Sequence, residues 1–139
     1  MINGTIIHPD ILAALARSGH TGKVLIVDGH FPSSTFLAPS VPKVFLNLRP
    51  GSLTVTEVLA AVLDTVTVES AVAATFEDDE KPDIWADYEK TLPPGVPLVP
   101  VKGSQITSAF SDRDTALAIM TGDTRAAACI VLSLGLRAA

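Results

Sequence analysis

The stretch KVLIVDGHFP, residues 23–32, decides the fold of this 139-residue chain. Its first five residues, Lys23 to Val27, are mostly apolar and rich in β-branched side chains, which is typical of a strand buried on both faces. Asp28 follows at the carboxyl end of this strand, and a loop rich in proline and serine continues the chain. The stretch therefore predicts a sheet with other elements packed against both of its sides.

A short helix is expected just before this strand. Apolar residues recur at helical spacing from Pro9 to Ser18, with Pro9 suited to the first helical position and Gly19 to the residue just past the end. The helix then stops at His20. We expect His20 and Asp28 to lie at the same edge of the sheet.

Strands and helices alternate along the rest of the chain. Thr54 and Glu57 have the spacing of a capping box, and apolar residues follow them at helical spacing, so the most clearly marked helix opens at Thr54. The alternation predicts an α/β fold with one layered domain over residues 1–139. The other expected elements are strands near 44–48, 67–76, 98–101, 115–120 and 129–133 and helices near 82–92 and 104–111.

Composition limits the classes of partner. Hydrophobic residues make up 47% of the chain and charged residues 18%, a balance that indicates apolar surface covered by other subunits. The net charge of -5 argues against nucleic acid, which proteins bind through clustered lysine and arginine. The N-terminus lacks the pattern of a signal peptide, and no apolar run approaches about 18 residues, so we expect neither export nor membrane insertion.

Several motifs are expected to carry no metal or nucleotide. The lone Cys129 can form neither an intrachain disulfide nor a cysteine-rich metal site, and it fits a reducing cytoplasm best. The three histidines are separated in sequence, so we expect neither a metal nor an organic cofactor. The acidic run 77–80 lacks the spacing of a calcium loop, and TGDTR at 121–125 lacks the glycines and lysine of a phosphate-binding loop.

Three residues offer acid–base chemistry. A histidine that titrates near neutral pH beside a carboxylate suits proton transfer, and His20 with Asp28 and His30 provides this combination. The end of a helix just before His20 also favours its protonated form. From the pattern alone, His20 could equally be a capping or turn residue, and Asp28 a turn former.

Trp85 and Tyr88 are three residues apart in the expected helix 82–92. An aromatic pair at this spacing can form a platform for a sugar ring. Amphipathic helices more often pack such pairs into the core, so we favour the core or a subunit interface.

With these residues placed, the chain resembles the D-ribose pyranase / L-fucose mutarotase (RbsD/FucU) family over essentially its whole length. Gly19 and His20 are followed eight residues later by Asp28, within D-x-H-F-P. The resemblance continues through PDIWADYEKTL at 82–92 to the TGD turn at 121–123. The histidine of DGHFP and the IWADYE segment are closer to the fucose mutarotase branch.

The resemblance implies a cofactor-free enzyme that interconverts the cyclic forms of a fucose-like or ribose-like monosaccharide. It implies an α/β subunit that assembles into rings, commonly decamers, with the sugar near a subunit boundary. It also implies that His20 is the acid/base and that Asp28 binds the sugar nearby. In this interpretation Asp28 joins His20 in proton exchange, while His30, Gln105 and Cys129 shape the pocket.

Departures from the family pattern support a second interpretation. Where the family carries a tyrosine and an asparagine that contact the sugar, this chain has Ala127 and Cys129. Gln105 stands where the family tends to have an arginine or histidine. Each lost hydrogen bond to a sugar costs about 1 kcal/mol or more. The alternative is therefore a non-catalytic sugar-binding or regulatory subunit that keeps the fold.

The apolar composition and the family resemblance together predict an oligomer of at least four subunits. Light scattering at micromolar protein concentration should give a mass at least four times that of the chain. A monomer under these conditions would contradict the prediction and would also remove any pocket shared between subunits.

Overall fold

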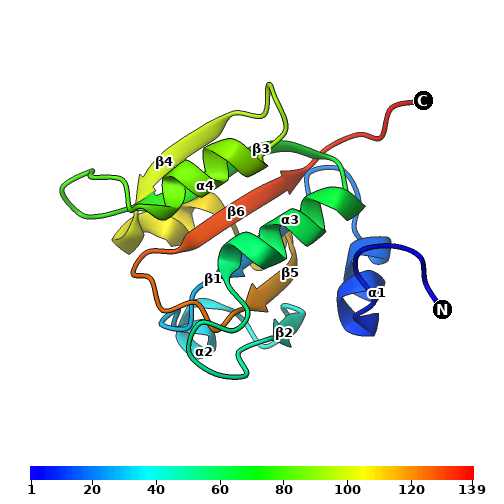
Figure 1. Ribbon diagram of the computed structural model, residues 1–139, viewed down its shortest axis with the longest axis horizontal. Helices are drawn as coiled ribbons and strands as arrows, with labels where there is room; N and C mark the ends of the chain where they lie inside the picture. The colour runs from blue at the N-terminus through cyan, green and yellow to red at the C-terminus, as the bar shows by residue number, and fades with distance from the viewer.

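Strand β1 (Lys23–Val27) lies inside a six-stranded sheet in the computed structural model, which describes residues 1–139. It pairs in parallel with β5 (Thr115–Met120) and antiparallel with β6 (Cys129–Leu134). The strand order is β2-β5-β1-β6-β3-β4, and β6 runs against all five other strands. The carboxyl ends of those five strands therefore meet at one edge of the sheet, together with the start of β6 (Figure 1).

The remaining elements alternate between helix and strand, as the sequence predicts. The helices on one face are α1 (Pro9–Arg17), α3 (Val55–Thr65) and α4 (Ile84–Thr91). The short elements are α2 (Ser33–Phe36) and the 3₁₀ helix η1 (Gly103–Ala109). The other strands are β2 (Lys43–Phe45), β3 (Val68–Thr75) and β4 (Leu98–Lys102).

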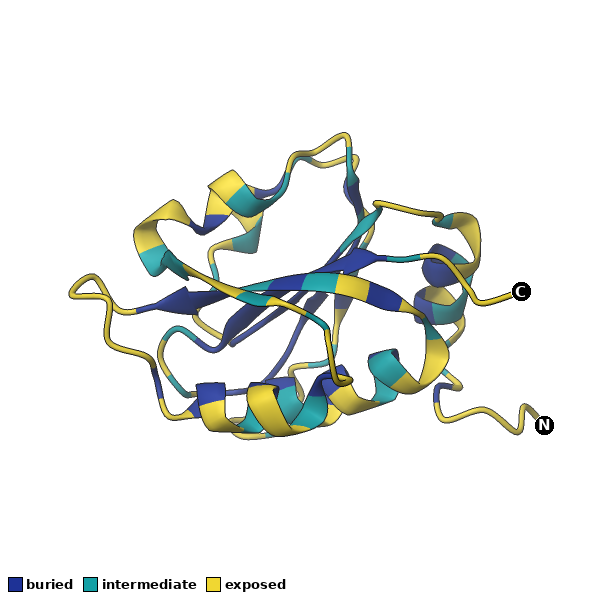
Figure 2. Cartoon of the chain, turned by 90° about the horizontal axis from the view of Figure 1, so that it is seen from above, coloured by how far each residue is buried: buried dark blue, intermediate teal, exposed yellow.

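Both faces of the sheet are buried, but by different layers. Along β1, Val24 and Ile26 face the larger core, which α1, α3 and α4 cover. Leu25 and Val27 face a smaller core, covered by η1 and the segment around α2. Figure 2 shows helices on both sides of the strands, with the buried residues concentrated in the strands. The prediction that residues 23–27 form a strand buried on both faces is confirmed.

The predicted capping box and the predicted burial of the aromatic pair are both confirmed. Thr54 caps α3, with the Glu57 backbone N–H donating to its hydroxyl oxygen at 3.2 Å. The Glu57 carboxylate in turn accepts the Thr54 backbone N–H at 2.8 Å. Trp85 and Tyr88 are buried in the larger core, and the Trp85 indole N–H donates to the Ala74 carbonyl oxygen.

Two local expectations need correction. The loop after β1 contains a helical turn, α2, which its prolines and serines did not suggest. The segment expected as a helix near 104–111 is a 3₁₀ helix that begins and ends earlier, at Gly103 and Ala109. None of the helices combines the length and the apolar character that crossing a bilayer requires.

Replacing Thr54 with Ala should lower the free energy of unfolding by about 0.5–2 kcal/mol, because it removes the side-chain cap of α3. Urea unfolding at a single protein concentration measures this. Thr107→Ala is the matched control, since Thr107 is exposed and outside α3. Equal unfolding curves for Thr54→Ala and the parent would show that the capping box contributes nothing.

Candidate functional site

The carboxyl edge of the sheet brings together residues from three parts of the chain. Asp28 follows β1, Thr121 and Asp123 follow β5, and Cys129 opens β6. Backbone hydrogen bonds join these segments: the Gly29 N–H donates to the Asp123 carbonyl at 2.8 Å. Crevices outside the carboxyl ends of parallel strands are where open α/β sheets bind ligands. A ligand site is therefore expected at this edge.

A small pocket of about 170 Å³ opens at this edge beside Asp28 and His30. It is smaller than the roughly 300–1,000 Å³ of pockets for drug-sized ligands, which limits it to a small molecule. Asp28 and His30 supply its ionisable groups. The other lining residues are Phe31, Pro32, Phe36, Ala74, Gly103, Ile106, Ala127 and Cys129.

Asp28 is buried, with only 6% of its surface exposed. Its carboxylate accepts the backbone N–H of His30 at 2.8 Å, as the short turn after β1 allows. Burial raises the pKa of Asp28, and the hydrogen bond and charge of His30 offset only part of this effect. Asp28 therefore holds its proton more strongly than an exposed aspartate, which suits a group that exchanges protons.

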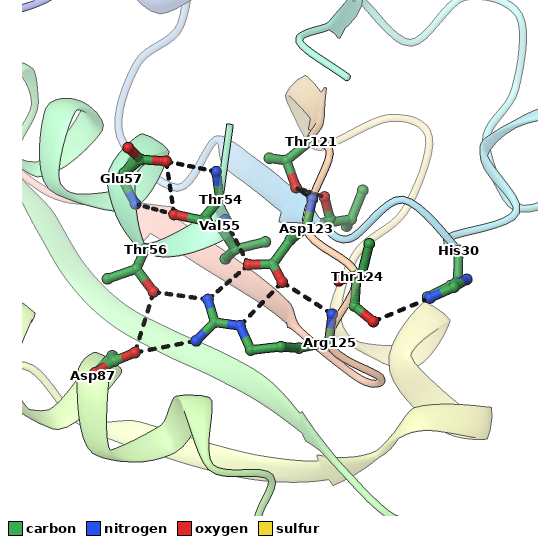
Figure 3. Close-up of polar contacts among 11 residues, drawn as sticks. His30, Thr54, Val55, Thr56, Glu57, Asp87, Thr121, Asp123, Thr124 and Arg125 are labelled. Atoms are coloured by element: carbon green, nitrogen blue, oxygen red, sulfur yellow. Dashed lines mark hydrogen bonds and ion pairs between the residues drawn. The ribbon is translucent and has the colours of Figure 1, made fainter. Parts of the chain in front are cut away.

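His30 is held at the rim of the pocket by its ring nitrogen. Nε2 lies 3.3 Å from the carbonyl oxygen of Thr124, as Figure 3 shows. Since a carbonyl oxygen only accepts, Nε2 carries the hydrogen and Nδ1 of the neutral ring is the free acceptor. His30 thus presents a basic nitrogen beside the buried carboxyl group.

The remaining expected binding residues differ in their placement. Cys129 lines the pocket, and burial raises the pKa of its thiol, so this wall is neutral at pH 7. Ala127 lines the same wall and contributes no hydrogen-bonding side chain. Gln105 is exposed on η1, where its neighbours Gly103 and Ile106 line the pocket and Gln105 does not.

The expectation that His20 and Asp28 share one edge of the sheet is wrong. His20 lies just before β1 and Asp28 just after it, so the whole strand separates them. Five residues of strand span about 17 Å at about 3.3 Å per residue. The imidazole of His20 is 45% exposed at the amino edge, where Nε2 lies 2.8 Å from the Glu69 carboxylate. One chain therefore does not bring His20 and Asp28 to the same ligand.

An ion pair between the buried Asp123 and the partly exposed Arg125 was missed from the sequence. The Asp123 carboxylate is 2% exposed and accepts the Val55 backbone N–H, at the first residue of α3, at 2.9 Å. Arg125 donates its backbone N–H and Nε–H to Oδ1 and an Nη2–H to Oδ2, at 2.7–3.0 Å (Figure 3). Both residues belong to the motif TGDTR, where a carboxylate and a guanidinium two positions apart are the signal for this pair in the sequence.

The Arg125 guanidinium extends the network to α4. It donates from Nη1 to the Asp87 carboxylate and from Nη2 to the Thr56 hydroxyl oxygen, each at 3.2 Å. Burial alone would raise the pKa of Asp123, but hydrogen bonds from Arg125 and Val55 outweigh it and the net pKa is lowered. Asp123 is therefore ionised and stabilises the fold, whereas Asp28 at the same edge has a raised pKa.

These two buried aspartates should respond in opposite ways to the same substitution. Asp123→Asn should lower the free energy of unfolding at pH 7 by about 1–3 kcal/mol, because it replaces one of the buried acceptor oxygens to which Arg125 and Val55 donate. Asp28→Asn should leave that free energy unchanged or raise it, because it removes a buried charge. Urea unfolding of the two variants and the parent measures both effects.

The pH dependence follows from the two pKa shifts. Asp123 has a lowered pKa, so its stabilising effect should disappear as pH falls below the ordinary value of 3.8. Asp28 has a raised pKa, so its destabilising effect should appear as pH rises through that raised value. Equal losses of stability in both variants at pH 7 would contradict this assignment.

Comparisons with known proteins cover the whole domain. A sequence profile of the RbsD / FucU transport protein family matches residues 1–137. D-ribose pyranase 1 of Rubrobacter xylanophilus is 31% identical over 136 residues, which is 97% of this chain and 98% of that protein. The fucose mutarotase of Mus musculus is 31% identical over 97 residues, 63% of this chain and 61% of that protein. Relatives of both names match, so a closer relation to the fucose mutarotase branch stays a prediction.

Solved structures share the fold. Bacillus subtilis RbsD complexed with D-ribose superimposes with a TM-score of 0.83 at 21% identity, covering 99% of this chain and 100% of that one. The fucose mutarotase of Streptococcus pneumoniae in complex with L-fucose gives a TM-score of 0.78 at 18% identity, with the same coverage. The profile match and the full-length relative decide the matter: this chain belongs to the RbsD/FucU family.

Proposed function

We propose that this protein interconverts the cyclic forms of a monosaccharide by acid–base opening of the sugar ring. The pocket at the carboxyl edge carries the proposal, because Asp28 places a buried carboxyl group on a small cavity and His30 adds a hydrogen-bonding ring at its rim. The names of the relatives, D-ribose pyranase and fucose mutarotase, support a sugar as substrate.

The proposed reaction moves only protons. A proton leaves the anomeric hydroxyl and another reaches the ring oxygen as the bond between that oxygen and the anomeric carbon breaks. Closing the open chain onto the other face of the carbonyl, or through another hydroxyl, gives a different cyclic form. Side chains that donate and accept protons are sufficient for this step, so the proposal includes neither a metal nor an organic cofactor. We place this activity in the cytoplasm, where a lone buried cysteine such as Cys129 stays reduced.

We further propose that two copies of the chain form each complete site. His20 lies at the amino edge of the sheet and Asp28 at the carboxyl edge, with β1 between them. His20 of one copy can therefore act on a sugar held by Asp28 and His30 of another. An assembly is then required for activity, and the family resemblance favours a ring, commonly a decamer.

A second candidate function is sugar binding without catalysis. Ala127 and Cys129 line the pocket wall where the family pattern has a tyrosine and an asparagine. This apolar wall offers a bound sugar no strong hydrogen-bonding side chain. A protein that binds a sugar but does not open its ring would match this wall.

Replacing His20 with Ala should slow anomer exchange about a hundredfold or more, because general acid–base catalysis contributes about that much. Saturation-transfer NMR measures exchange directly on a panel of fucose, ribose and galactose. His30→Ala should mainly weaken sugar affinity, since His30 lies at the pocket rim. His8→Ala is the matched control, because His8 caps α1 and does not line the carboxyl-edge pocket.

Mixing variants tests the site shared between copies. His20→Ala and Asp28→Asn should each be inactive alone, yet mixed assemblies should regain activity at up to about a quarter of their sites. No recovery after confirmed subunit mixing would contradict the shared site. Sugar binding with unchanged exchange in the parent would favour the second candidate function.

A further inference from the structure

The imidazole of His20 has one side-chain partner, Glu69. Nε2 of His20 lies 2.8 Å from Oε2 of Glu69, across 49 residues of sequence. We propose that Glu69 is a positioning residue for His20, which it holds so that Nδ1 is the atom that exchanges protons with the sugar. This inference rests on the proposed function and assigns the reacting atom within it.

The chemistry of the pair determines which nitrogen is free. An ionised carboxylate only accepts hydrogen bonds, so Nε2 of the neutral ring carries the hydrogen that it donates to Glu69. Nδ1 then has the free lone pair and is the nitrogen that takes up a proton. A carboxylate that holds an imidazole in one tautomer has the same role in other acid–base sites, where it also stabilises the imidazolium.

The backbone of β3 directs Glu69 towards His20. The pairing of β3 with β6 shifts in register between Val68 and Ser70, which places a bulge at Glu69. A bulge changes the direction of a side chain relative to regular strand alternation, and bulges are common beside active sites. The alternation of side chains along a regular strand therefore does not predict that Glu69 contacts His20.

A glycine opposite the bulge leaves room for the Glu69 side chain. A Cβ built at Gly135 would lie 3.1 Å from the Glu69 Cβ and 3.3 Å from its backbone nitrogen. Both distances are shorter than ordinary van der Waals contact, so a larger residue there would press against Glu69. Gly135 itself is fixed by its N–H, which donates to the Thr67 carbonyl at 2.9 Å.

The turn that carries His20 is anchored on the same strand, β6. Thr21 adopts a positive φ of 72°, which is uncommon for a β-branched residue. Its backbone N–H donates to the Leu134 carbonyl at 2.9 Å. His20 and Glu69 are thus both positioned against the end of β6, at Leu134 and Gly135. The bulge, the glycine and the strained turn are three separate features of the backbone that converge on one side-chain contact.

Other charged groups border His20 without contacting its ring. Arg137 shares one surface pocket with His20, and Arg113 and Asp114 share the pocket on the other side. The Asp114 carboxylate accepts the Ser111 backbone N–H at 2.7 Å. Glu69 is therefore the carboxylate in a position to orient the imidazole.

Two substitutions at Glu69 separate orientation from charge. Glu69→Ala removes the acceptor, whereas Glu69→Gln keeps an oxygen that can accept the Nε2–H. At saturating sugar, Glu69→Ala should slow exchange about tenfold or more, because the ring loses its fixed orientation. Sugar affinity should stay near that of the parent, since Glu69 does not line the carboxyl-edge pocket. Glu69→Gln should recover part of the lost rate.

The tautomer of His20 gives a readout that does not depend on activity. In ¹⁵N NMR spectra at pH 9, where an ordinary histidine is neutral, His20 of the parent should carry its hydrogen on Nε2. In the Glu69→Ala variant this preference should weaken to that of a solvent-exposed imidazole, and a spectrum of His20→Ala assigns the signal. Glu89→Ala is the matched control, because Glu89 is exposed on α4 and away from His20. Light scattering verifies that each variant assembles like the parent.

The outcomes distinguish this inference from the proposed function. Exchange in Glu69→Ala as fast as in the parent at saturating sugar would overturn the positioning role. A hydrogen on Nδ1 of His20 in the parent would overturn the assignment of the reacting nitrogen. A parent that exchanges no sugar of the panel would contradict the proposed function, while the spectra would still decide whether Glu69 sets the tautomer.

Discussion

The buried carboxylate of Asp123 is the constraint on which the geometry of the carboxyl edge depends. Its side chain joins the end of β5 to the first N–H of α3 and to Arg125. Its carbonyl oxygen accepts the N–H of Gly29, the residue after Asp28. The neighbouring Gly122 fits only because it has no side chain, since a Cβ there would collide with the Ser52 and Arg49 carbonyl oxygens. Asp123 thus fixes the turn with Asp28 through its backbone carbonyl, and the start of α3 and Arg125 through its carboxylate.

Asp28 and Asp123 show how one environment gives two carboxylates different roles. Both are buried at the same edge, and burial alone raises the pKa of each. Asp123 receives hydrogen bonds from a guanidinium and two backbone N–H groups, which outweigh burial. Asp28 receives less compensation and stays costly to ionise. The pattern of hydrogen-bond donors therefore separates the residue that holds the fold from the residue that is available for chemistry.

Local patterns in the sequence predicted the helices and strands well. They did not predict the contacts between residues that are distant in sequence. The strand at 23–27 and the capping box of Thr54 and Glu57 depend on neighbouring residues, so the spacing of side chains revealed them. The Glu69 contact with His20 depends on a bulge that sequence spacing does not encode. The error over His20 and Asp28 has a simple cause: a residue that ends a helix before a strand lies at the strand's amino end. Applying strand direction to both residues would have placed them at opposite edges.

The separation of His20 from Asp28 cannot be closed by a movement within one chain. Strand β1 is buried along Val24 to Val27 and hydrogen-bonded on both sides, to β5 and β6. Breaking those ladders would expose the centre of both cores, at a cost comparable with unfolding the domain. The distance between the two residues is therefore a rigid property of the fold. A sugar that needs both groups must bind where the amino edge of one copy meets the carboxyl edge of another, so assembly becomes part of the proposed catalytic mechanism.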